Sequence, residues 1–592
     1  MEERKRGQIY AASGIKKAEL VLKHGIIFNV FTEEMEKGDI AIEQGMIVGI
    51  GDYSGEIEVE LDERIVCPGF IDGHIHLESS MVSPWEFEQI VLPHGTTTVI
   101  ADPHEIANVA GQDGIDFMIS VTKELDLDVF FMLPSCVPAS VLDESGSVLS
   151  EKELRKYYQD DQVLGLAEVM DFYGTVGAKA EILRKIADAY QYRSCVDGHA
   201  PGLSGKTLNA YIAAGVRSDH ECTVFEEAKE KIQRGQWVMV REGTAAHNLE
   251  ALMPLFQEPY ASRTMLVTDD KHPGDLLRLG HIDYIIREAI KRGADPMKAI
   301  KMGSFRAAEY FGLKDRGAIA PGYRADLVIL SDLKQMQIDC VYKNGKLVAE
   351  NGKYLKMGKI KRKKDGLEEI KLEGRVKKRV FSSFHMPVLK EKDFYLPITG
   401  KRQRVICLTP SELLTKEKEY TPSQVKGCAP GVDVSRDIVK LAVVERHHDS
   451  GHIGVGFLGG YGLKQGAVAS SIAHDSHNLI IAGINDGDMT VAGNCVRKNQ
   501  GGLAIAQNGE IIAELPLPIA GLMGILPAER INARLEEMKK ILWGMGIAEG
   551  IDPFMTLAFV SLPVLPKCRL NTYGVIDVDK QKIVPVFYDE DS

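Results

Sequence analysis

The chain has 592 residues, of which 44% are hydrophobic and 26% are charged, and its formal net charge is −13. This length predicts about three or four domains, and the composition is that of an ordinary globular protein. The acidic excess disfavours a general nucleic-acid binder or membrane-surface binder, because phosphate groups would be repelled.

The nine cysteines are scattered without CxxC pairs, which is typical of reduced thiols in a cytosolic protein. The first residues, Met-Glu-Glu-Arg-Lys-Arg-Gly, lack the apolar segment of a secretion signal. The sequence contains no run of about 18 apolar residues, so no transmembrane helix is predicted. We therefore expect a cytoplasmic protein without a membrane partner.

Two β-rich blocks flank a long middle part. Residues 18–50 alternate in the manner of short strands joined by Gly turns. A similar pattern returns at residues 322–348, which contain a strong Asn-Gly hairpin signal. We predict one small β-sandwich domain, built from residues 1–63 together with residues 316–356.

Residues 64–315 alternate strand-like and helix-like patterns, which indicates a parallel sheet with helices outside it. Predicted helices such as residues 151–159 and 178–190 separate most of the strand candidates. Eight β/α units in about 250 residues fit a closed (β/α)8 barrel. A doubly wound open sheet is the alternative. The strand candidates are residues 64–71, 97–102, 129–133, 163–168, 194–199, 216–220, 237–241 and 264–269.

The stretch from Lys353 to Arg379 carries twelve Lys or Arg residues and few apolar ones. Interspersed acidic residues favour a solvated linker, assigned to residues 357–379, over a nucleic-acid or targeting patch. Residues 380–592 then form a C-terminal domain of mixed α/β pattern, with a helix predicted over residues 527–545.

Metal-ligand residue types stand at the ends of most of the predicted barrel strands, beginning with His74-Ile75-His76. Residues two apart on a strand point the same way, so both imidazoles can reach one divalent ion. A barrel brings the later strand ends into the same ring, and chance does not place six residues of ligand type there. The predicted metal ligands are His74, His76, Glu168, His199, His220 and Asp269.

Four histidines and two carboxylates exceed the needs of one tetrahedral site and suit two divalent ions. Glu168 is the natural bridge, because it lies along the chain between the first histidine pair and the two later histidines. Asp269 can ligate one ion and accept the proton of a bridging water. Nitrogen and oxygen ligands suit Zn²⁺, Mn²⁺ or Fe²⁺, and residue types alone do not choose among them.

Further polar residues near the strand ends are candidates for substrate contact or proton transfer. His104 and Glu105 follow the second barrel strand, and Glu242 follows the seventh. Glu221 and Asp270 come directly after two of the predicted ligands. A structural role is the alternative for each of these residues.

In the C-terminal domain, His474 and His477 lie three residues apart in an Ala-His-Asp-Ser-His-Asn string. This spacing suits one helix face or a loop. Three interpretations stay open: an additional metal site, a loop that reaches the barrel mouth and contacts substrate, or a structural polar turn.

The string Pro68-Gly-Phe-Ile-Asp-Gly-His-Ile-His76, the order of the ligands and the closing string Gly317-Ala-Ile-Ala-Pro-Gly-Tyr-Arg-Ala-Asp-Leu-Val328 resemble the amidohydrolase superfamily. Within it, the chain resembles the bacterial-type adenine deaminase family. The resemblance covers nearly the whole chain, including the C-terminal domain that most members of the superfamily lack. The strings that carry it lie at residues 76–80, 101–108, 198–202, 218–223, 267–270 and 473–478.

This resemblance implies hydrolytic deamination of adenine to hypoxanthine and ammonia, by a metal-activated hydroxide that attacks C6. It implies a binuclear centre, with Mn²⁺ as the first choice and Fe²⁺ or Zn²⁺ as alternatives. It also implies that Glu168 stands where some relatives use a carboxylated lysine. A role in purine salvage or adenine catabolism follows, and we expect a homodimer.

The expected mechanism needs two proton transfers. Asp269 would take a proton from the hydroxide and deliver it to the departing amine, while a second acid protonates ring N1. The candidates for that acid are Glu242, Glu221 and His104.

Three alternative functions would place different demands on this sequence. A guanine or cytosine deaminase or a cyclic amidase on the same barrel would use similar ligands, and the choice of substrate depends on pocket groups that one sequence does not display. A non-enzymatic scaffold would show broken ligands, whereas all six are intact here. Nucleic-acid deamination is disfavoured by the acidic charge and by the missing Cys-based zinc signature.

Overall fold

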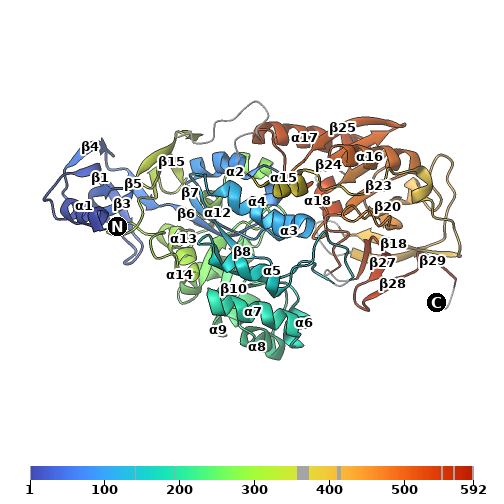
Figure 1. Cartoon of the computed structure of the whole chain (residues 1–592), viewed down its shortest axis with the longest axis horizontal. Coiled ribbons are helices and arrows are strands. Elements are labelled where there is room, and N and C mark those ends of the chain that lie inside the picture. The colour runs from blue at the N-terminus through green and yellow to red at the C-terminus, as the bar shows by residue number, and fades with distance from the viewer. Residues whose placement is uncertain are drawn as a thin grey trace.

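The computed structural model describes residues 2–140, 142–193, 195–355, 372–409, 415–548, 551–563 and 567–589. The molecule is elongated, with an N-terminal β-rich end, a central part of parallel strands and helices, and a C-terminal sheet at the opposite end (Figure 1). Within the described ranges, no helix has the length and apolar character needed to cross a bilayer.

Strands from both flanks of the central part share one nine-stranded sheet. In it, β1 (Ala18–Asn29) pairs antiparallel with β2 (Glu34–Glu43) and parallel with β5 (Ile65–Pro68). The late strand β14 (Leu327–Asp332) pairs antiparallel with β5, which brings the chain back to its N-terminal end. The remaining strands are β3 (Met46–Gly51), β4 (Gly55–Glu60), β15 (Gln337–Lys343), β16 (Lys346–Glu350) and β17 (Lys353–Tyr354).

The central part holds eight parallel strands in two sheets, ordered β10-β9-β8-β7-β6 and β11-β12-β13. Backbone hydrogen bonds join the sheets at both margins. The Asp269 amide donates to the His74 carbonyl at 2.9 Å, and the Arg217 amide donates to the Val196 carbonyl at 3.0 Å. The strands are β6 (Phe70–Ile75), β7 (Thr96–Ala101), β8 (Asp128–Leu133), β9 (Val163–Val169), β10 (Cys195–Gly198), β11 (Ser218–Asp219), β12 (Trp237–Arg241) and β13 (Thr264–Val267).

The first predicted strand, residues 64–71, needs a correction. It is the end of one strand and the start of another, since β5 lies in the nine-stranded sheet and β6 in the parallel one. Gly69 separates them at a close approach, where a Cβ would stand 2.3 Å from the Thr97 hydroxyl oxygen. As a consequence, His74 lies within β6 rather than in a turn after it.

Helices cover the outside of the parallel strands (Figure 1). The predicted helices over residues 151–159 and 178–190 correspond to α5 (Glu151–Arg155), which a 3-10 turn extends, and to α7 (Ala180–Tyr192). Ile182, Ile186 and Ala189 of α7 are buried at helical spacing and form the face that packs on β9 and β10.

The C-terminal part is built on a second nine-stranded sheet, ordered β19-β18-β21-β20-β23-β22-β24-β25 with β29 beside β18. Helix α16 (Asp486–Lys498) packs on β22, β23 and β24, and α17 (Ala528–Gly544) packs on β25. Helix α17 coincides with the helix predicted over residues 527–545. The loop between β22 (Ala467–Ser470) and β23 (Leu479–Gly483) holds His474 and His477. The other strands are β18 (Arg402–Leu408), β19 (Thr415–Tyr420), β20 (Ile438–Val444), β21 (Ile453–Gly459), β24 (Gly502–Gln507), β25 (Glu510–Pro516) and β29 (Phe587–Tyr588).

The end of the predicted basic linker is a packed helix, α15 (Gly374–Phe381), which lies along α4 (Gln112–Thr122). Arg375 Nη2 lies 2.8 Å from Asp113 Oδ1, and Arg379 Nη2 donates to the Gly146 carbonyl at 3.0 Å. The solvated-linker prediction is therefore wrong for residues 374–379. Residues 357–371 of that prediction lie outside the described residues.

Candidate active site

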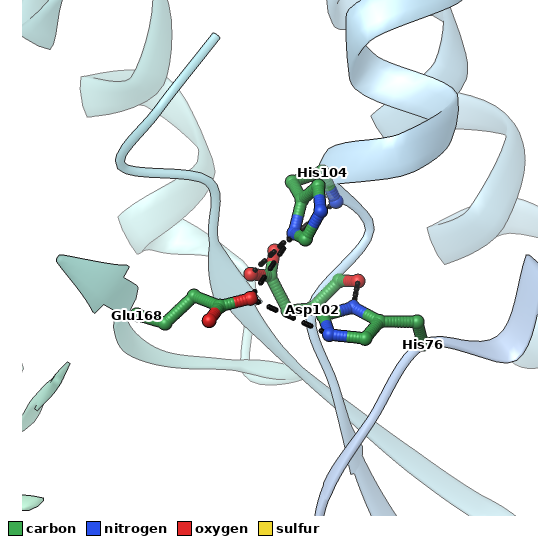
Figure 2. Close-up of side chains that lie close together, drawn as sticks. All are labelled: His76, Asp102, His104 and Glu168. Carbon is green, nitrogen blue, oxygen red and sulfur yellow. Dashed lines mark hydrogen bonds and ion pairs between the residues drawn. The ribbon is translucent and has the colours of Figure 1, made fainter. Parts of the chain in front are cut away.

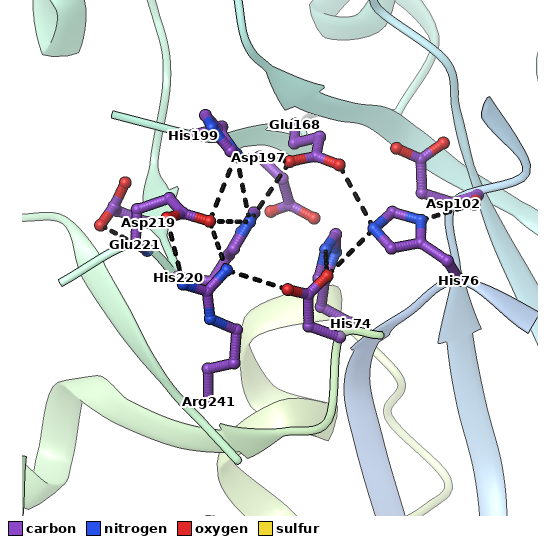
Figure 3. Close-up of polar contacts among 12 residues, drawn as sticks. His74, His76, Asp102, Glu168, Asp197, His199, Asp219, His220, Glu221 and Arg241 are labelled. Atoms are coloured by element: carbon purple, nitrogen blue, oxygen red, sulfur yellow. Dashed lines mark hydrogen bonds and ion pairs between the residues drawn. The ribbon is translucent and has the colours of Figure 1, made fainter. Parts of the chain in front are cut away.

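The six predicted ligands come together at the C-terminal ends of the parallel strands, as the shared edge of such strands requires. Figure 3 shows His74, His76, Glu168, His199 and His220 gathered in this way. Their ligand atoms form overlapping groups in which all members lie within 4.8 Å of one another. Five of the six residues are buried, and His199 is partly exposed. The groups contain His74, His76, Glu168, His199, His220 and Asp269.

Glu168, on β9, lies in the middle of this cluster. Its Oε1 is 3.4 Å from His76 Nε2, while its Oε2 is 2.8 Å from His199 Nδ1 and 3.2 Å from His220 Nε2. One carboxylate thus reaches the first histidine pair on one side and the two later histidines on the other. This is the position that a bridging ligand needs.

Asp269 follows β13 and faces the first histidine pair. Its Oδ1 lies 3.1 Å from His76 Nε2 and 3.5 Å from His74 Nε2, and its Oδ2 accepts a hydrogen bond from Arg241 at 2.9 Å. The backbone of Asp269 is left-handed, with φ of 61°. A non-glycine residue in that region is strained, and such strain is concentrated at functional sites.

The surroundings of His74 indicate whether the site suits a metal ion. Its Nε2 is buried and has no hydrogen-bond partner among the described residues. The ring is stacked on His220, with centroids 4.3 Å apart and planes 19° from parallel. A buried nitrogen without a partner is destabilising by about 1–3 kcal/mol unless a ligand takes its lone pair. The nitrogen and oxygen donor set therefore fits a divalent cation.

Burial and charge compete in this cluster. Burial alone would raise the pKa of the Glu168 carboxyl, but His199, His220 and His76 hold that pKa well below its usual range. Burial alone would lower the pKa of His76, but Asp269 and Glu168 raise it well above its usual value. Cations that bind here must displace protons from the histidines, so metal affinity rises with pH.

His104 and Asp102 extend the cluster on one side of Glu168, and both side chains face it (Figure 2). His104 is the first residue of α3 (His104–Ala110), and its Nδ1 lies 3.0 Å from Asp102 Oδ2 and 3.5 Å from Glu168 Oε1. The Asp102 carbonyl lies 3.1 Å from His76 Nδ1. Asp102 was not among the site residues predicted from the sequence, although it directly follows strand β7.

Arg241 was also missed. It is the last residue of β12, and its guanidinium contacts both Oε atoms of Glu221 as well as Asp269 Oδ2. Glu221 Oε1 lies 3.3 Å from His220 Nε2 and 3.5 Å from His199 Nδ1. Burial would raise the pKa of Glu221, but His199 and Arg241 keep it far below the usual range. Glu221 is therefore an ionised member of the site.

An internal ion pair supports the chain beside these ligands. Lys231 Nζ is fully buried and lies 3.0 Å from Asp219 Oδ2, 2.8 Å from Glu227 Oε1 and 2.8 Å from the Ala200 carbonyl. Asp219 in turn accepts hydrogen bonds from the amides of Ala200 at 2.8 Å and Glu221 at 3.0 Å. The pair thus fixes the backbone next to His199 and Glu221.

Replacing Lys231 with methionine is expected to destabilise the protein by about 3–5 kcal/mol, because Asp219 would keep a buried charge without its cation. Thermal unfolding followed by circular dichroism measures this effect. Lys229→Met on the same helix is the control, since Lys229 is more exposed. Equal melting temperatures for the two variants would contradict the assigned role.

Glu242 does not join the cluster. Its Oε1 lies 2.9 Å from His247 Nδ1, and its Oε2 accepts a hydrogen bond from the Leu249 amide at 3.2 Å. The carboxylate therefore secures the loop that follows β12. The catalytic role predicted for Glu242 is not supported by this geometry.

The variant Glu242→Gln should consequently keep kcat within about threefold of the parent and lose at most about 1–3 kcal/mol of stability, through weakened loop hydrogen bonds. Steady-state kinetics and a melting curve check this. A fall in kcat of about a hundredfold with metal retained would restore Glu242 to the catalytic residues.

The loop of His474 and His477 reaches the central part and binds Glu105 of α3. His474 Nδ1 lies 2.5 Å from Glu105 Oε1, and His477 Nε2 contacts Glu105 Oε2. His477 Nδ1 accepts a hydrogen bond from the Ala473 amide at 3.2 Å, so Nε2 carries the proton in the neutral ring. A nitrogen that carries a proton donates rather than ligates. This favours a loop that reaches the candidate site over an additional metal site.

Known proteins and family models resemble this chain over nearly its whole length. Residues 65–348 match the amidohydrolase family, and residues 412–582 match the adenine deaminase C-terminal domain. The adenine deaminase 2 of Carboxydothermus hydrogenoformans is 44% identical over 578 residues, which is 98% of each chain. This chain belongs to the adenine deaminase family.

Two further members of the adenine deaminase family have the same extent. The adenine deaminase of Bacillus pumilus is 44% identical and covers 98% of this chain and 99% of its own length. That of Kosmotoga olearia is 45% identical and covers 98% of both chains. The resemblance inferred from the sequence strings is thereby confirmed, and it includes the domain that carries His474 and His477.

Proposed function

We propose that this chain hydrolyses adenine to hypoxanthine and ammonia. The observation that carries the proposal is its full-length similarity to relatives named adenine deaminase, at 44–45% identity over 98% of this chain. The cluster around Glu168 supplies groups suited to hydrolysis at a ring carbon. We further propose that the protein is a cytoplasmic homodimer that serves purine salvage or adenine catabolism.

We infer that the eight parallel strands form a single closed (β/α)8 barrel. The backbone hydrogen bonds at both margins of the two parallel sheets support this inference. We also infer four parts: a small β domain of residues 1–63 and 316–356, a barrel of residues 64–315, a connecting segment, and a C-terminal domain of residues 380–592. The sheets described above support this division.

The proposed cofactor is a pair of divalent ions, Mn²⁺ first and Fe²⁺ or Zn²⁺ as alternatives. His74, His76 and Asp269 would hold one ion, His199 and His220 the other, and Glu168 would bridge them. When bound, such ions lower the pKa of water toward neutrality and make hydroxide available at pH 7. The buried Nε2 of His74, which makes no hydrogen bond within the described residues, supports this assignment.

In the proposed reaction, Asp269 receives a proton from the attacking water and passes it to the departing amine. Arg241 holds Asp269 Oδ2, which leaves Oδ1 as the oxygen that faces the reacting atoms. One water and one adenine thus give hypoxanthine and ammonia.

A second group must deliver a proton to ring N1. Glu221 is ionised and paired with Arg241, and Glu242 is turned into its own loop. His104 is the remaining candidate, held by Asp102 beside Glu168. We therefore propose His104 as the group that protonates N1. His104 regains a proton when the second proton of the attacking water leaves the C6 oxygen and the carbonyl of hypoxanthine forms.

An ammonia-release assay on Mn²⁺-loaded protein tests the function. Adenine should be turned over with the highest kcat/KM among adenine, guanine, cytosine and a cyclic amide. Release of ammonia from another ring at a higher kcat/KM would favour the alternative, a deaminase or cyclic amidase of another base-like ring. No turnover of any of them would contradict the proposed function.

A further inference from the structure

A pocket lies where the central part meets the C-terminal part. The central part contributes Ser79, from the turn after His76, and Asp270, which directly follows Asp269. The C-terminal part contributes His474 and Phe559. The cavity therefore adjoins the candidate metal ligands, and its wall is completed by a domain that lies outside the parallel strands.

The lining is mostly apolar, with a few polar groups whose positions are fixed. This combination is typical of sites for small aromatic ligands. Ser79 Oγ donates to Asp270 Oδ1 at 2.5 Å, which holds the carboxylate at the cavity wall. A carboxylate accepts hydrogen bonds, and adenine offers N–H groups both on its five-membered ring and at the 6-amino position.

Glu105 determines how the C-terminal loop enters the cavity. It lies 2.5 Å from His474 Nδ1 and also contacts His477 Nε2, although both histidines lie more than 360 residues further along the chain. With Nδ1 of His474 taken by Glu105, Nε2 is the nitrogen left for a ligand. The Glu105 carboxylate also raises the pKa of His474 to about 9, against the lowering effect of burial, so Nε2 carries a proton at neutral pH.

Phe559 is fixed together with His474. The two rings are stacked, with centroids 4.5 Å apart and planes 23° from parallel. The His474 amide donates to the carbonyl of Ala558, the residue before Phe559, at 2.9 Å. Loop and helix α18 (Pro553–Ala558) therefore present these two rings to the cavity as one unit.

We propose that this cavity is the purine subsite: Phe559 packs on the adenine ring, Asp270 accepts an adenine N–H, and His474 Nε2 donates to a ring nitrogen. This inference rests on the proposed function and adds the groups that recognise the substrate. It assigns the C-terminal domain a direct part in binding adenine.

Phe559→Leu is the sharpest test, because it removes the aromatic face and leaves Glu105 and the candidate ligands untouched. The KM for adenine should rise roughly tenfold or more, since stacking of a base on an aromatic ring contributes at this level. Binding of hypoxanthine by calorimetry should weaken by the same factor, with metal content unchanged. Tyr395→Leu, an exposed aromatic residue of the C-terminal part, is the control and should match the parent.

His474→Ala should weaken hypoxanthine binding as well, and its metal content should also match the parent. Active parent enzyme together with unchanged KM and unchanged hypoxanthine binding in both variants would overturn the subsite and leave the proposed function standing. A parent that releases no ammonia from adenine would contradict the proposed function. In that case the hypoxanthine measurements on parent and variants would still decide the subsite.

Discussion

Asp269→Asn is expected to lower kcat for adenine by about 10²–10⁴-fold, because an amide cannot take a proton from the attacking water and pass it to the amine. The amide oxygen can still face the histidine pair, so metal content should stay close to that of the parent. Rates come from the ammonia-release assay, and metal content comes from elemental analysis of the same samples.

The control for this variant is Asp339→Asn. Asp339 lies on β15, and its carboxylate is 3.6 Å from the Arg64 guanidinium. It should leave kcat unchanged. Turnover of Asp269→Asn close to that of the parent, with metal retained, would rule out proton transfer by Asp269. A variant that binds less metal but keeps the parent's rate per bound ion would show that Asp269 acts only as a ligand.

Glu168→Gln is expected to abolish binding of at least one metal ion and to lower turnover by several orders of magnitude. The reason is geometric: both carboxylate oxygens are in use, one toward His76 and the other toward His199 and His220. An amide offers one oxygen and a nitrogen that only donates, so it cannot serve both sides.

Glu242→Gln is the matched control, because it is also a buried glutamate near the end of a parallel strand. Its carboxylate contacts His247 and the Leu249 amide instead of the cluster. Full metal content and activity in Glu168→Gln would contradict the bridging role. Equal losses in the two variants would indicate a general effect of removing buried charge.

The convergence of the six candidate ligands could be predicted from the sequence because parallel strands end at a common edge whatever their detailed packing. A position at or near the C-terminal end of each strand was therefore enough to bring the set together. The same reasoning missed Arg241, because an arginine is not a ligand type and its role appears only once Glu221 and Asp269 lie beside it.

Contacts set by local loops or by distant segments could not be predicted. Glu242 stands at a strand end, as the ligands do, but the loop at residues 247–249 turns its carboxylate away. Residues 64–71 form an apolar run in the sequence. The pattern does not show that the chain passes at Gly69 from the nine-stranded sheet to the parallel sheet. The contact of Glu105 with His474 joins residues 369 positions apart, and no periodicity reports such a pair.

Titration of the metal-free protein with Mn²⁺ tests the central claim most directly. We predict that adenine turnover rises with added metal and reaches its maximum at two ions per chain, with both ions lost in the combined variant His74→Ala, His220→Ala. Full adenine turnover in protein stripped of metal, or a maximum at one ion per chain, would contradict the binuclear site around Glu168.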